Sequence, residues 1–136
     1  MKRWALGASI IVFGLAFVAA LDVGYSRWSE LSRWSEPEDE RVGVGYLVWY
    51  LVIASPLLAL ALLAWREWIS SVALAAGVLI STAIIWAAFH TAWTDESSTA
   101  ALALLAAPLY GLTAVSIVFA LDQIVDALRR RRAAEP

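Results

Sequence analysis

YLVWYLVIASPLLALALLAW, residues 46–65, is followed after only three residues by ISSVALAAGVLISTAIIWAAF, residues 69–89. Neither run contains Asp, Glu, Lys or Arg, and each is close to the roughly 20 residues that a helix needs to cross about 30 Å of hydrocarbon. Because lipid offers no hydrogen bonds, the backbone groups of such a run must pair within it, so both runs are predicted to be helices. The three-residue link predicts a tight antiparallel helical hairpin.

The chain as a whole has the same apolar character. It is 62% hydrophobic and only 16% charged, with a mean hydropathy of +0.73, whereas soluble domains are roughly 45–50% apolar. The first apolar run also resembles a cleavable signal peptide, because Lys2 and Arg3 precede it and small residues end it. We predict an all-α, integral membrane four-helix bundle that forms one domain over residues 1–136, with helices at about residues 4–21, 46–65, 69–89 and 99–121.

The basic residues predict the orientation of this bundle. With the N-terminus inside, seven Lys and Arg residues flank the inner ends of the helices and three lie in the outer loops. Cytoplasmic loops carry the excess of Lys and Arg in most membrane proteins. We therefore expect a cell-membrane protein with both termini cytoplasmic, an outer loop at residues 22–45 and a cytoplasmic tail at residues 122–136.

Charge and cysteine content exclude several functions. A net charge of -2 gives no overall attraction to nucleic acid, so no nucleic-acid partner is expected. Without cysteine the chain has no disulfide, thiol nucleophile or thiolate metal site. No metal and no cofactor are expected.

A doubled word lies in the expected outer loop. Residues 26–36 read SRWSELSRWSE, and on a helix Trp28, Leu31 and Trp34 share one face with Tyr25 while opposite charges pair at i,i+3 spacing. This pattern predicts a short interfacial amphipathic helix with its indoles at headgroup level. One alternative is a docking surface for an outer partner, formed by Trp28, Leu31 and Trp34. Another is a ligand site built on the two indoles.

Small residues recur every fourth position in the last two apolar runs. This small-xxx-small spacing lets helix backbones approach closely. It predicts packing within the chain or contact with another subunit. The residues are Ala73, Gly77, Ser81, Ala103, Ala107 and Gly111.

Prolines and the C-terminal arginines mark two further features. Pro56 and Pro108 lie near the middle of their runs and predict static kinks, with a hinge as the alternative. The arginines follow the last apolar run and predict a stop that fixes topology, or a site for anionic lipid or an acidic partner. They are Arg129, Arg130, Arg131 and Arg132.

The polar content of the apolar runs bears on function. Ion-coupled carriers and proton relays place ionisable groups at depth, and these four runs contain no Asp, Glu, Lys or Arg. The single histidine, His90, is expected to be interfacial and hydrogen-bonded, while a site with Asp95 and Glu96 is the alternative.

We therefore expect a non-enzymatic accessory, scaffold or assembly subunit of a larger membrane complex. The expected partners are membrane lipids and either another membrane protein or further copies of this chain. A small oligomeric channel or transporter, with its pathway between subunits, is the second hypothesis. An enzyme that uses His90 is the third.

Overall fold

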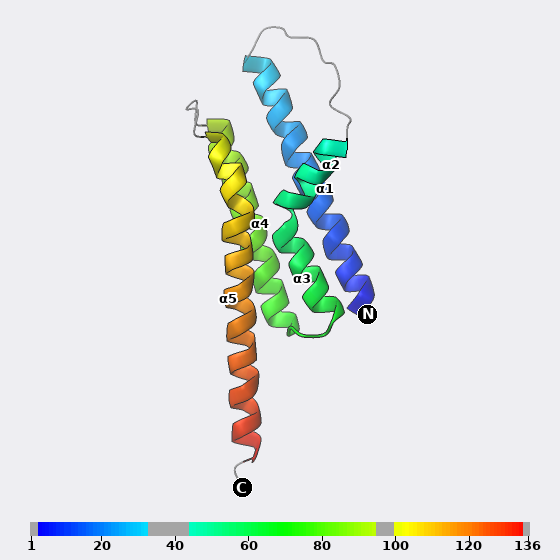
Figure 1. The fold of residues 1–136 in the computed structure, drawn as a ribbon, viewed down its shortest axis with the longest axis vertical. Coiled ribbons are helices and arrows are strands. Elements are labelled where there is room, and N and C mark those ends of the chain that lie inside the picture. The colour runs from blue at the N-terminus through cyan, green and yellow to red at the C-terminus, as the bar shows by residue number, and fades with distance from the viewer. Residues whose placement is uncertain (1–2, 33–43, 95–99, 135–136) are drawn as a thin grey trace.

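A computed structural model describes residues 3–32, 44–94 and 100–134 of the chain (Figure 1). These residues form five helices and contain no strand. The expected all-α fold is therefore confirmed for this part of the chain. The helices are α1 (Arg3–Ser32), α2 (Val44–Ile53), α3 (Ser55–Trp65), α4 (Ser71–Thr94) and α5 (Ala100–Ala134).

Three of these helices are long and apolar enough to cross a membrane. The segments are Arg3–Gly24, Ser71–Ala92 and Leu102–Ala134. A fourth crossing is present if α2 and α3 are counted together as one bent span. The chain therefore has the architecture of an integral membrane protein with three or four spans.

The second span differs from the continuous helix expected at residues 46–65. The helix is interrupted at Ala54, and the axes of α2 and α3 differ by 69°. Pro56 supplies no N–H, and its ring excludes the carbonyl four residues earlier, so the hydrogen-bond ladder of α2 cannot continue through it. The ladder ends where the Ala54 N–H donates to the Tyr50 carbonyl (2.8 Å) and restarts where the Leu58 N–H donates to the Ala54 carbonyl (3.0 Å). Pro56 thus produces a break instead of the expected kink.

α3 is the helix around which the others pack. It contacts α1 on one side and α4 and α5 on the other (Figure 1). Glycines of α1 allow its close approach: a Cβ on Gly7 would lie 3.1 Å from the Ala61 carbonyl oxygen, and one on Gly14 would lie 3.1 Å from Leu57 Cδ1. The buried side of α3 consists of Pro56, Leu57, Leu60, Ala61 and Ala64.

A short turn joins α3 to α4, which confirms the predicted hairpin. Glu67 adopts a left-handed backbone conformation, with φ at 58°. The Glu67 N–H donates to the Ala64 carbonyl (3.2 Å), and the Trp68 N–H donates to the Leu63 carbonyl (3.1 Å). These two bonds form a Schellman motif, which satisfies carbonyls left free at the end of a helix and reverses the chain.

Three helices extend beyond their predicted ends. α1 continues through residues 22–32, so the described part of the doubled word forms the end of a long helix instead of starting a separate one. α4 continues to Thr94, and α5 continues to Ala134. Most of the expected tail is therefore helical. Trp34 and the rest of the doubled word lie outside the described residues.

α1 begins and α5 ends at the same end of the bundle (Figure 1). We call this the basic end, because Arg3 on α1 and Arg129 on α5 line one cleft there together with Glu67 of the α3–α4 turn. The last turns of α5 project past the other helices (Figure 1).

Candidate functional site

The predicted small-residue faces pack mainly inside the chain. Gly77, Ser81, Ala107 and Gly111 are buried, while Ala73 and Ala103 are partly exposed. A Cβ on Gly77 would lie 2.7 Å from Leu60 Cδ2, and a Cβ on Gly111 would overlap the ring of Pro56. These two glycines therefore allow α4 and α5 to approach α3, which is the first of the two roles considered for the spacing.

An apolar groove nevertheless runs along the surface of the bundle between α4 and α5. It has a volume of about 500 Å³ and is lined largely by alanines. Tyr110, at its edge, is 68% exposed. We call it the α4–α5 groove; its lining includes Ala87, Ala88, Ala103, Ala106, Ala107, Tyr110, Thr113, Ala114 and Ile117.

The two threonine hydroxyl groups of the groove are bonded to their own helices. Thr91 Oγ1 donates to the Ala87 carbonyl (2.9 Å), and Thr113 Oγ1 donates to the Leu109 carbonyl (2.8 Å). A serine or threonine bonded in this way offers little to a ligand. The groove can therefore receive an apolar helix or an acyl chain. Apart from the exposed Tyr110 hydroxyl, it has little with which to orient a polar solute.

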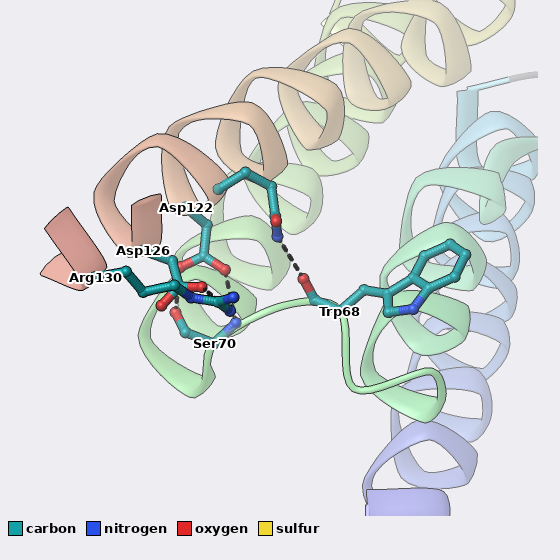
Figure 2. Close-up of polar contacts among 6 residues, drawn as sticks. Trp68, Ser70, Asp122, Asp126 and Arg130 are labelled. Carbon is teal, nitrogen blue, oxygen red and sulfur yellow. Dashed lines mark hydrogen bonds and ion pairs between the residues drawn. The ribbon is translucent and has the colours of Figure 1, made fainter. Parts of the chain in front are cut away.

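A polar contact fastens α5 to the α3–α4 turn at the basic end (Figure 2). The Ser70 N–H donates to Asp122 Oδ2 (2.8 Å), and Ser70 Oγ donates to Asp122 Oδ1 (2.6 Å). Beside them, Gln123 Nε2 donates to the Trp68 carbonyl (2.8 Å). We call Trp68, Ser70, Asp122 and Gln123 the clamp.

Ser70 has a second role as the N-cap of α4. Its Oγ accepts the N–H of Ala73 at 3.2 Å, as expected when a serine side chain satisfies the third residue of a helix. Asp122 thus sits beside the positive end of the α4 dipole. The hydrogen bond from Ser70 Oγ lowers the pKa of Asp122, and the Ser70 N–H and the charge of Arg129 act in the same direction while desolvation opposes them.

The cleft beside the clamp carries charges of both signs. Arg3 Nε lies 3.9 Å from Glu67 Oε1, and Arg130 donates to Asp126 at 2.6 Å. All four side chains are well exposed, so each pair contributes well under about 1 kcal/mol. Within the described part of the chain, no group of three or more His, Cys, Asp or Glu side chains is placed to hold a metal ion.

The C-terminal arginines lie on the projecting turns of α5 and are all exposed. Arg129 also lines the cleft beside the clamp. Their predicted binding of anionic lipid stays a prediction.

His90 lies on an exposed part of α4. Its ring stacks on Trp86, with the ring centroids 5.1 Å apart and the planes inclined by 7°. Asp95 and Glu96 lie outside the described residues, so the alternative catalytic cluster stays a hypothesis.

A second polar contact joins α1 and α2. The Tyr50 hydroxyl donates to Asp22 Oδ2 at 2.7 Å. The two residues are 28 apart in sequence, and their meeting depends on how α2 returns along α1. Periodicity gives no signal for such a pair, and the sequence reasoning missed it.

Comparison of the chain with models of protein families, with curated proteins and with solved structures found no match.

Proposed function

We propose that this protein is a non-enzymatic accessory or assembly subunit of a larger membrane complex, and that the α4–α5 groove receives a transmembrane helix of its partner. The alanine lining of the groove carries this proposal. Association of helices in lipid depends on close packing, and small residues at an interface permit the closest backbone approach. A groove lined by alanines suits that contact better than it suits a polar ligand.

The interior of the bundle supports an accessory role over transport by a single chain. Among the described residues, Ser81 is the only polar residue that is buried, and the hydroxyl oxygen of the partly buried Thr82 beside it is buried as well. The other buried residues form an apolar core centred on α3. A solute would therefore meet no polar pathway between the described helices.

We further propose that the chain lies in the cell membrane with the basic end in the cytoplasm. Arg3 and Arg129 flank the same cleft, and positive residues are concentrated on cytoplasmic surfaces. The doubled word would then lie at the outer surface, where an amphipathic arrangement of Trp28, Leu31 and Trp34 provides a second contact for a partner.

The test is extraction from native membranes into nanodiscs, followed by mass measurement and identification of every bound protein. The expected result is a stoichiometric larger membrane protein. Ala106→Leu fills the groove and should remove that protein, whereas the matched Ala75→Leu, at an exposed position of α4 outside the groove, should retain it.

Two results would contradict the proposal. One is retention of the larger protein by Ala106→Leu at the level of the unmodified chain. The other is a preparation that contains only copies of this chain. The second result would favour the oligomeric channel or transporter, which flux measurements in vesicles would then examine.

A further inference from the structure

α5 is longer than a membrane crossing requires. Its 35 residues span about 52 Å at 1.5 Å per residue, whereas the hydrocarbon core is about 30 Å thick. The uncharged part of α5 ends at Leu121, and residues 122–134 continue the same helix for about 20 Å more. We call residues 122–134 the α5 extension; it forms the projecting end of the molecule in Figure 1.

The clamp determines which side of the α5 extension faces the bundle. Asp122 and Gln123 bond to the α3–α4 turn, and Asp126 lines the adjoining cleft. At 100° per residue, the opposite side of the helix is turned away from the other helices. That outward side carries Leu121, Ile124 and Leu128, which are between 51% and 57% exposed, whereas Val125 lines the cleft beside the clamp.

These outer residues have the spacing of a coiled-coil seam. Leu121, Ile124 and Leu128 are separated by three and four residues, and Ile117 precedes them by four. Alternation of three and four is the a/d pattern by which helices pack side chains into one another. With Leu121 and Leu128 at a and Ile124 at d, the flanking e and g positions hold Ala120, Val125 and Ala127, while the b, c and f positions hold Asp122, Gln123, Asp126, Arg129 and Arg130.

We propose that a second copy of this chain covers this outer seam, through parallel packing of the α5 extensions. Copies inserted with the same topology present their α5 helices in parallel, so each Leu121 and Leu128 meets its own counterpart. Leucine at a with isoleucine at d favours three or four strands over two. The alanines at the g positions, Ala120 and Ala127, widen the apolar face and so also favour more than two strands. The expected assembly is therefore a trimer or tetramer.

The seam on the α5 extension is not positioned to be buried in lipid. The α5 extension is unbroken with the rest of α5, and the clamp holds its charged side against the α3–α4 turn. It therefore continues away from the membrane instead of turning to lie on it. Ile124 and Leu128 are left facing water unless another helix covers them, which the hydrophobic effect disfavours.

The arginines limit the seam. Arg131 falls at the next d position, where copies would bring like charges together in a parallel assembly. Salt screens such exposed charges. Self-association through the seam should therefore strengthen as the salt concentration rises, the opposite of what binding to an anionic surface would show.

The absence of cysteine from the chain permits a direct test with single-cysteine variants of the full chain in its native membrane. Leu128→Cys should form disulfide-linked dimers of this chain on mild oxidation. Arg130→Cys is the matched control, because it lies two residues away on the opposite side of the helix and should form at least tenfold less. Equal cross-linking of the two variants would overturn the proposal. So would a Leu128→Cys adduct whose mass corresponds to a different protein.

A second pair of variants tests the assembly without cross-linking. Native mass measurement after extraction into nanodiscs should show three or four copies of this chain per particle for the unmodified chain and for Arg130→Asn, but one copy per particle for Leu128→Asn, whether or not a partner protein is also bound. Circular dichroism would verify that all three retain the same helix content. A single copy of the unmodified chain per particle, or several copies that persist in Leu128→Asn, would refute the seam. Neither pair of variants alters the α4–α5 groove, so this result is independent of the accessory role.

Discussion

Gly77 and Gly111 permit a sharp test of how α4 and α5 pack on α3. Gly111→Ala would place a Cβ on the Pro56 ring, whereas Gly77→Ala would place one 2.7 Å from a methyl group of Leu60. Pro56 is buried and its ring cannot rotate away, but a leucine methyl can move by a small adjustment of its side chain.

The expected difference follows from overpacking. Forcing an extra methyl group into a filled core costs about 1–3 kcal/mol, and the rigid ring places Gly111→Ala in that range. Gly77→Ala should cost less than about 1 kcal/mol. The helix-propensity gain of up to about 1 kcal/mol for Gly→Ala should mostly cancel, because a membrane chain retains helical hydrogen bonding in its spans when the helices separate.

The assay is reversible unfolding in mixed micelles, followed by the fluorescence of the eight tryptophans. Gly111→Ala should unfold at a clearly lower fraction of denaturing detergent, and Gly77→Ala close to the unmodified chain. If Gly77→Ala lost as much stability as Gly111→Ala or more, the packing argument would be refuted.

Two further predictions concern the basic end. The pKa of Asp122 is lowered in the folded chain below its ordinary value of 3.8, so its contribution to stability is present above that pH and is lost as the pH falls through the folded-state pKa. Asp122→Asn should lower the free energy of unfolding by about 1 kcal/mol at neutral pH. This variant should also lose less stability on acidification than the unmodified chain, as measured by detergent unfolding between pH 6 and 3. Identical stability–pH profiles for the two chains would contradict the clamp. Glu67→Gly should raise the free energy of unfolding by about 1 kcal/mol, because glycine adopts the left-handed conformation without strain. Glu67→Ala keeps that strain and should give no such increase. Equal effects of the two substitutions in the same assay would argue against strain at residue 67.

The helical spans were predictable because no charged residue interrupts the apolar runs. The break in the second apolar run could not be predicted, because proline in a membrane helix produces either a kink or a break. Here the Pro56 ring lies against Gly111 of α5, where no side chain opposes it. That contact is between residues 55 apart and has no local signal.

The functional surfaces were predictable only in part. Spacing identified Gly77 and Gly111 as small-residue positions, but spacing gives the side of a helix and does not show what packs on it. The clamp joins Ser70 to Asp122 across 52 residues. The signal that could have found it was topological: the two residues lie next to the ends of apolar runs that meet at the same end of the bundle.

If α2 and α3 are counted as one bent span, the 69° angle between them also has a consequence for the thickness of the surrounding bilayer. α3 has 11 residues and α2 has 10, which correspond to about 16 Å and 15 Å of helix. Measured along the axis of α3 at that angle, the pair reaches about 22 Å, roughly 8 Å less than a typical hydrocarbon core. A short span is accommodated by local thinning of the bilayer. As one bent span, α2 and α3 would therefore suit a thinner bilayer than α1 and α5. The lipids around this protein would then adjoin two different hydrophobic thicknesses.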